Sequence, residues 1–172
     1  MPIDYFATLT NCVMKNLLLY LTVFSIFFMA SCGEEEPEEE PEPTIEMVVS
    51  AKIDEKDYRS ETDNVSTEIS NGNYRVTAKD LPQSFRIIVK GTPEVKKYIL
   101  NGDLEESGAK VIWSSSNLTV DADHVIIDGN LDITGFEGGL LKGFFEGTAR
   151  RVSEPYPTVV ITKGYVEAKF PN

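Results

Sequence analysis

The stretch His124-Val125-Ile126-Ile127-Asp128-Gly129-Asn130-Leu131-Asp132-Ile133 decides the fold class of this 172-residue chain. Apolar residues recur at every second position, and polar residues fill most of the positions between them. The apolar set is Val125, Ile127, Leu131 and Ile133, with Gly129 in phase; the polar set is His124, Asp128, Asn130 and Asp132. Successive side chains of a strand point to opposite faces, so every second residue shares a face. This stretch therefore predicts a β-strand with one buried face.

The same alternation recurs along the rest of the chain. It is present at residues 45–53, 74–78, 85–89, 109–113 and 141–149. Asn71-Gly72 is a strong hairpin signal, since both residues tolerate positive φ. Strands separated by short turns, without a sustained helical period, predict an all-β domain over residues 45–172. We expect an antiparallel β-sandwich or a lipocalin-like barrel of about eight to ten strands.

Glycines mark the irregular places in this pattern. Gly143 and Gly147 fall on the apolar face of their strand, where a missing side chain permits close approach or a bend. The last strand changes phase: the apolar residues are Val159 and Ile161 before Lys163-Gly164, and Val166, Ala168 and Phe170 after it. This shift predicts a β-bulge with Gly164 in a left-handed conformation, so replacing Gly164 should destabilise the domain.

A short apolar segment, residues 17–30, precedes the domain. Its 14 residues are too few for a membrane span, which needs about 20, but they match the core of a secretory signal. Lys15 stands before it, and small residues follow it at Ala30-Ser31. We predict a signal sequence over residues 1–31. Residues 1–13 add nothing that a signal needs, and Met14 is the better natural start.

The tetrad Met29-Ala30-Ser31-Cys32 resembles the lipobox of bacterial lipoproteins. The resemblance implies that Cys32 carries a diacylglyceryl group, that cleavage occurs before it, and that its new amino group is acylated. Membrane lipid would then be a partner through Cys32, and two or more chains suffice for a stable anchor. The alternatives are an uncleaved signal anchor and an ordinary secreted protein.

The segment after Cys32 is an acidic tether, so residues 32–44 form a lipidated cysteine and its spacer. Seven glutamates lie between Glu34 and Glu42, interrupted only by proline. Such a segment has too few apolar residues to fold, and its like charges extend it. Acidic residues at this place resemble the surface-export signals of some Gram-negative lipoproteins. We therefore expect the cell outer membrane, with exposure to the outside; the alternative is a periplasm-facing domain.

Charge and cysteine content exclude several function classes. The net charge of −12 falls mainly on the tether, and residues 44–172 carry only −5. A basic footprint for nucleic acid is absent from this composition. Both cysteines precede the domain, at Cys12 and Cys32, so the domain has no disulfide, cysteine–zinc site or thiol nucleophile.

Few residues suggest catalysis or metal binding, and we predict no enzyme and no cofactor. His124 is the only histidine, and without a Gly-x-Ser-x-Gly elbow we interpret it as a solvated turn residue. Asp121, Asp123 and Asp128 are weak candidates for calcium, but they lack the EF-hand spacing; a polar turn is the alternative. Among the aromatic residues, Trp113, Tyr98 and Tyr74 are expected in the core. Alternation points Phe144 outward, where it could mark a contact site.

Three runs are similar to an uncharacterised family of small Gram-negative outer-membrane lipoproteins: Gly129–Thr134, Leu141–Phe145 and Val160–Val166. The resemblance implies a lipobox, a β-rich domain and a closing Ile-Thr-x-Gly strand, without an activity. We therefore expect a non-catalytic binding or envelope-accessory module with a protein or glycan partner. The alternatives are a lipocalin-like carrier of a small apolar ligand and a glycan hydrolase, which would need two carboxylates facing each other across a groove.

The location of the domain can be tested by protease shaving of intact cells that make the native protein. The surface-export interpretation of the glutamates predicts loss of the domain to protease, because a short acidic tether holds it outside the membrane. Immunoblotting of cells before and after treatment measures the loss. Full protection would confine the domain to the periplasm and contradict the interpretation.

Overall fold

The computed structural model describes residues 45–115 and 123–171. These residues belong to one unit, Thr44–Asn172. The predicted signal sequence, Cys32 and the tether lie outside the described residues, as does Asp121. Ten strands and two short helical turns make up the described part, so the predicted all-β fold is confirmed.

The strands follow one another closely, in agreement with the turn signals of the sequence. Their bounds are β1 Val48–Ile53, β2 Lys56–Glu61, β3 Val65–Ser70, β4 Asn73–Asp80, β5 Gln83–Lys90, β6 Lys97–Leu100, β7 Ala109–Ser114, β8 Asp123–Glu137, β9 Leu140–Arg151 and β10 Thr158–Lys169. The helical turns are η1 Thr62–Asn64 and α2 Leu104–Ser107. Asn71 and Gly72 both have positive φ, as the predicted hairpin requires.

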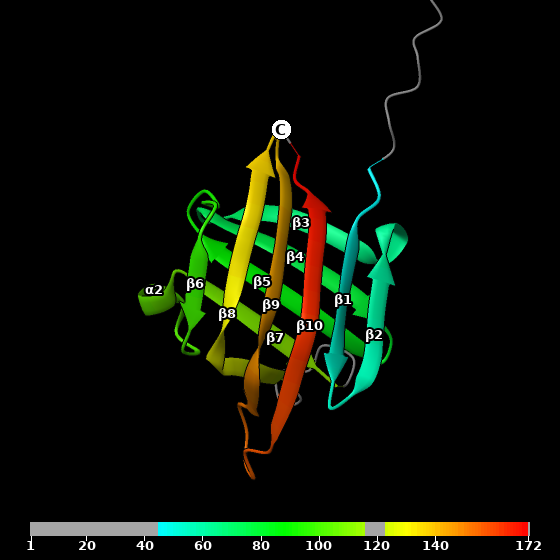
Figure 1. Ribbon diagram of the computed structural model, residues 1–172, viewed down its shortest axis with the longest axis vertical. Coiled ribbons are helices and arrows are strands. Elements are labelled where there is room, and N and C mark those ends of the chain that lie inside the picture. Colours follow the sequence, from blue (N-terminus) through cyan, green and yellow to red (C-terminus); the bar gives the residue numbers. More distant parts are fainter. Residues whose placement is uncertain (1–44, 116–122, 172) are drawn as a thin grey trace, which may run out of the picture. The chain divides into compact units, whose positions relative to one another are not determined.

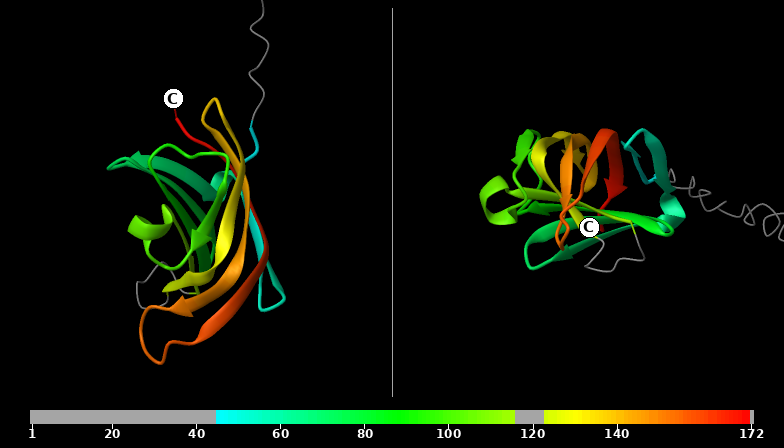
Figure 2. Two further views of the ribbon diagram at one scale, coloured as in Figure 1. Left: turned by 60° about the vertical axis from the view of Figure 1, so that its left-hand side comes forward. Right: turned by 90° about the horizontal axis from the view of Figure 1, so that it is seen from below.

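All ten strands belong to one antiparallel sheet, in the order β2-β1-β10-β9-β8-β7-β5-β4-β3, with β6 added beside β8. The sheet folds over into two layers (Figures 1 and 2): β6, β8, β9, β10, β1 and β2 form the front layer, and β3, β4, β5 and β7 cross behind it. The Ser60 hydroxyl of β2 donates to the Lys79 carbonyl at 2.9 Å. The Thr67 hydroxyl of β3 donates to the Lys169 carbonyl at 2.7 Å. These bonds bring the two sheet edges together, so the fold is a flattened, nearly closed barrel.

The sheet turns from the back layer to the front layer at a pair of facing glycines. β8 pairs with β7 near its start and with β6 further on. Gly129, the first residue of β8 to pair with β6, stands opposite Gly147 of β9. A Cβ atom on Gly129 would lie 2.2 Å from the Glu146 carbonyl oxygen, and one on Gly147 would lie 2.4 Å from that of Asp128. A side chain at either position would force the strands apart, so the bend requires glycine.

A β-bulge accompanies this bend and changes which side chains face the core. The β8–β9 register shifts between Ile126 and Asp128. Ile126, Leu131 and Ile133 lie in the core cluster, whereas Val125 and Ile127 do not. The sequence pattern therefore predicted the buried face correctly at Leu131 and Ile133 and wrongly at Val125 and Ile127. The extra residue of the bulge reverses the alternation between the two pairs.

The predicted bulge of the last strand is present, but its geometry differs from the expectation. The β10–β9 register shifts between Ile161 and Gly164. Lys163, with φ of 52°, adopts the left-handed conformation, and Gly164 does not. Gly164 meets a different constraint: a Cβ there would lie 2.3 Å from the Phe145 carbonyl oxygen and 2.5 Å from its ring. Gly143 is likewise close to β8, since its Cβ would lie 2.8 Å from the Asp132 carbonyl oxygen.

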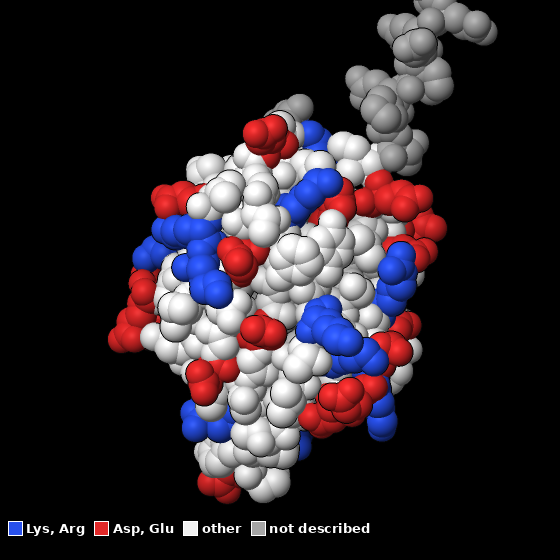
Figure 3. All heavy atoms as spheres, viewed as in Figure 1, with Lys and Arg blue, Asp and Glu red and all other residues white. Residues whose placement is uncertain are grey.

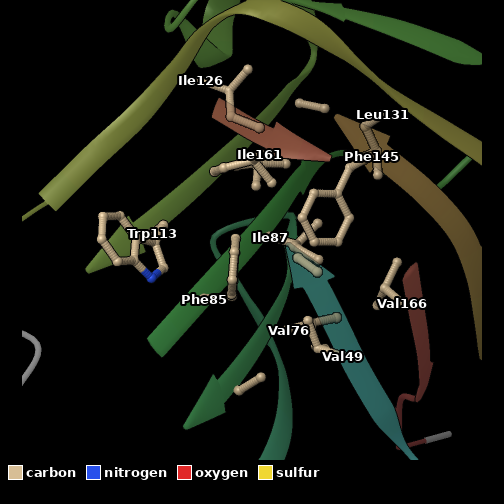
Figure 4. Packing of buried hydrophobic residues seen from close by; sticks show 14 of the residues in the cluster. Val49, Val76, Phe85, Ile87, Trp113, Ile126, Leu131, Phe145, Ile161 and Val166 are labelled. Carbon is tan, nitrogen blue, oxygen red and sulfur yellow. The ribbon is translucent and has the colours of Figure 1, made fainter. Parts of the chain in front are cut away.

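Side chains of the two layers meet in the interior (Figure 4). The ring of Phe85 in the back layer lies 5.4 Å from that of Phe145 in the front layer. Tyr58 packs edge-on against Phe85 at 4.8 Å, and Tyr74 packs against Phe170 at 5.0 Å. Phe85, Phe145 and Phe170 are at most 1% exposed. Direct ring contact between the layers fills the space between them at this level.

Replacing Gly164 by alanine should destabilise the protein by about 2 kcal/mol or more, because the added methyl group overlaps Phe145 in a packed strand pair. Gly135→Ala is the matched control: Gly135 is also a strand glycine, but a Cβ there meets nothing within 4 Å. Urea unfolding of both variants measures the change. Equal stabilities of the two variants would contradict the close approach at Gly164.

Candidate functional site

The outer surface of the front layer carries a row of side chains in register across six strands. From β6 to β2 the row is Lys97, Asp132, Phe144, Tyr165, Ser50 and Arg59. Phe144 and Tyr165 are its centre, and we call the surface around them the aromatic face. Figure 3 views this side of the molecule and shows uncharged side chains in the middle, with basic and acidic groups distributed around them.

Phe144 points away from the core, as the alternation predicts, and its side chain is 53% exposed. Its ring lies 5.3 Å from that of Tyr165, with a 47° angle between the ring planes. Leu141, Phe145 and Ala149, its neighbours on the other face of β9, are buried. The exposed ring is therefore a consequence of a regular strand and not of a frayed end.

Tyr165 is held in place by a hydrogen-bond network. Its hydroxyl donates to Glu167 Oε2, and Lys142 Nζ lies 2.6 Å from Glu167 Oε1. Partial burial and the bond to Glu167 raise the pKa of Tyr165 to about 12. The hydrogen bonds from Lys142 and Tyr165 lower the pKa of Glu167. At neutral pH the phenol is therefore neutral and the carboxylate charged, which orients the Tyr165 ring beside Phe144.

The aromatic face combines apolar rings with groups that form hydrogen bonds. Donors and acceptors in the register rows around the rings are Asn130, Asp132, Lys142, Glu146 and Glu167. Faces of aromatic rings carry partial negative charge and attract polarised C–H groups. The arrangement suits a ligand that has C–H groups on one side and hydroxyls along its edge.

The calcium candidates do not form a site within the described residues. Asp123 is buried and forms an ion pair with Arg86 of β5. Asp128 is exposed next to the β8 bulge, and Asp121 lies outside the described residues. Over residues 45–115 and 123–171, no three acidic, histidine or cysteine side chains gather as a metal site would require.

His124 is not the solvated turn residue that the sequence predicts. It is 5% exposed, and its ring lies 4.9 Å from that of Trp113. The prediction was wrong because the bulge after Ile126 reverses the alternation of β8. His124 therefore shares the inner face with Ile126 and is paired with the core residue Trp113. The expectations for the other aromatic residues are confirmed: Trp113 and Tyr98 are buried, and Tyr74 packs against the core.

A pocket of about 250 Å³ lies near the start of β1, and Glu46, Glu61 and Asp63 are among the residues that line it. Arg59 Nε lies 2.7 Å from Glu61 Oε1, so this carboxylate is engaged by a cation. A glycosidase needs a protonated carboxylic acid on one side of the scissile bond and a carboxylate on the other. The geometry does not assign these two roles here.

No protein-family model, no curated protein and no solved structure matches the chain. None of the helices in the described segments has the length and apolar character that a membrane crossing requires.

Sequence reasoning identified Phe144 but missed its partner, Tyr165. The signal was present: Val166 and Ala168 mark the buried phase of the strand after the bulge, which turns Tyr165 and Glu167 outward. Their proximity to Phe144 and Lys142 depends on the β9–β10 register, which the bulge at Lys163 determines.

Replacing Glu167 by glutamine should lower the pKa of Tyr165, because the charged carboxylate that accepts its hydrogen bond is lost. The substitution should also lower the free energy of unfolding at pH 7 by about 1 kcal/mol, a small value because solvent screens this partly exposed ion pair. Since the folded-state pKa of Glu167 is lowered, its contribution is present above the ordinary value of 4.5 and disappears as pH falls through the folded value. The contribution of Tyr165 to stability is complete below pH 10, its ordinary pKa, and is lost as the pH rises through the folded-state pKa of about 12.

Urea unfolding at neutral and acidic pH, with NMR titration of the Tyr165 ring, checks both effects. The control is Glu146→Gln, which changes an exposed glutamate of the same face. A wild-type Tyr165 that titrates near 10 would show that the network does not form.

Proposed function

We propose that this chain is a lipid-anchored, non-catalytic binding module of a Gram-negative outer membrane, and that its ligand is a glycan held on the aromatic face. The observation that carries the proposal is the exposed Phe144 ring, paired with Tyr165 at 5.3 Å in the middle of a regular sheet surface. The half-buried Tyr165 holds a second ring beside the exposed Phe144, so the two rings offer a surface on which a ligand can stack.

A glycan fits this surface better than a protein does. The central part of a protein interface is depleted of charged residues, and a standard interface buries about 800 Å² on each partner. Here the apolar centre is a single pair of rings, with Lys142, Glu167, Asp132 and Glu146 close by. A sugar ring can stack on the aromatic pair and use the surrounding groups for its hydroxyls.

The anchor follows from the sequence. The lipobox-like tetrad that ends at Cys32 supplies a lipid attachment point, and the glutamate run supplies a solvated spacer. A domain attached in this way remains at the membrane while its sheet surface is open to solvent. A module of this kind would retain envelope or external polysaccharide at the cell.

The two alternatives receive less support from the geometry. A lipocalin-like carrier needs an apolar cavity inside the barrel, whereas the Phe85 and Phe145 rings meet at 5.4 Å between the layers. A glycan hydrolase needs two carboxylates in distinct roles across a groove. The pocket near Glu46 contains carboxylates, but Arg59 engages one of them.

Phe144→Ala should weaken glycan binding at least ten-fold, about 1.4 kcal/mol, and leave stability nearly unchanged because the side chain is exposed. The measurement is isothermal titration of the full-length protein in detergent with soluble chito-, cello- and manno-oligosaccharides. Ile69→Ala is the matched control, since Ile69 is 47% exposed on β3 in the other layer.

Binding that Phe144→Ala and Ile69→Ala affect equally would contradict the assignment of the face. A panel in which no oligosaccharide binds, together with a protein that crosslinks to the wild type and not to Phe144→Ala, would replace the glycan by a protein partner.

A further inference from the structure

A second concave site lies on the outer side of the sheet, where the loop before α2 approaches the connection between β9 and β10. It is a pocket of about 340 Å³, which we call the basic pocket. Its polar lining is formed by Asn101, Asp103, Lys110, Arg150 and Arg151, and its apolar lining by Val125, Ile127, Val152 and Tyr156. None of these residues belongs to the register row of the aromatic face.

Positive charge collects in this pocket although the domain is acidic. Lys110, Arg150 and Arg151 line it, with Asp103 as the acidic residue of the lining. Residues 44–172 carry a net charge of −5, so the pocket has the opposite sign to the domain. Among the described residues, neither Lys110 nor Arg150 takes part in any of the ion pairs found.

The β8 bulge supplies the apolar part of the pocket. Because the register shifts after Ile126, Val125 and Ile127 lie outside the core cluster and line the pocket, Val125 as a buried side chain that is 8% exposed. Gly102, with φ of 87°, brings the loop before α2 close to Ile127: a Cβ on Gly102 would lie 3.1 Å from Ile127 Cγ2. The pocket is therefore built from β7, β8 and this loop, and not from one mobile segment.

Backbone hydrogen bonds hold the other wall. The Val152 N–H donates to the Asp123 carbonyl, and the Arg151 N–H donates to the Pro157 carbonyl, both at 2.9 Å. Between them Tyr156, with φ of 56°, places a half-exposed ring at the pocket. The connection extends below the barrel in Figure 1. Its attachment to β8 positions Arg150, Arg151 and Tyr156 together.

We propose that the basic pocket binds the phosphate monoester group of a small organic molecule. Arginine presents a planar fork of donors that matches phosphate oxygens, and lysine adds a point charge. A phosphate monoester carries up to two negative charges and three terminal oxygens, which Lys110 and Arg150 of the lining can contact. The volume fits a ligand of a few hundred Å³, and Val125, Ile127 and Tyr156 offer contact to its carbon skeleton.

The same phosphate chemistry occurs in a free sugar phosphate and in a lipid headgroup. Titrations of the full-length protein in detergent with glucose 6-phosphate and with short-chain phosphatidic acid separate these sources, and unphosphorylated glucose is the negative probe. We expect at least one phosphate monoester to bind, while glucose does not. Preference for the sugar phosphate or for the lipid then identifies the source.

Arg150→Gln and Lys110→Gln should each weaken this binding at least ten-fold, and Arg150→Lys should restore part of it. The matched controls are Arg59→Gln and Lys79→Gln, which remove exposed cations elsewhere in the domain; they should leave affinity unchanged. Equal losses in controls and pocket variants, or absence of binding to both phosphate monoesters, would overturn the proposal. Glycan binding on the aromatic face is measured separately with Phe144→Ala, so either site can fail without the other.

Discussion

The contact between Gly129 and Gly147 is the constraint on which the rest of the structure depends. The two residues face each other where β8 and β9 leave the back layer and enter the front layer. A Cβ atom on Gly129 would lie only 2.2 Å from a backbone carbonyl oxygen, and one on Gly147 only 2.4 Å from another. Only residues without side chains allow the strands to approach this closely while the sheet bends over itself. Without this bend the sheet could not bring β10 beside β3 and nearly close the barrel.

The bend determines where function can lie. By folding the sheet over, it brings Phe85 and Phe145 into contact and fills the interior. The bulge that accompanies it takes Val125 and Ile127 out of the core cluster, which supplies the apolar lining of the basic pocket. The second bulge, at Lys163, sets the register that places Tyr165 beside Phe144. Both candidate binding sites are thus on the outside of the barrel, and each depends on one irregularity in the strand pairing.

Sequence reasoning predicted the fold class and the outward Phe144 because both follow from a period of two. It detected the bulge in the last strand because the buried positions change phase between Ile161 and Val166. It missed the bulge in β8 because Val125, Ile126 and Ile127 are all apolar, so the phase change leaves no trace in the pattern. The wrong assignment of His124 has the same origin, since the undetected bulge puts His124 on the buried face with Ile126 and not on the polar face with Asp128. The basic pocket could not be predicted, because its residues come from four separate segments that only the folded sheet brings together.

The central claim is that the barrel interior is filled and that binding takes place on the outer surface. The most direct test is a nuclear Overhauser measurement between the ring protons of Phe85 and Phe145, with specific labelling of phenylalanine in the full-length protein. The account predicts direct cross-peaks between the two rings, whose centroids lie 5.4 Å apart. Absence of these cross-peaks, together with cross-peaks from both rings to an added fatty acid, would show an open interior and contradict the claim.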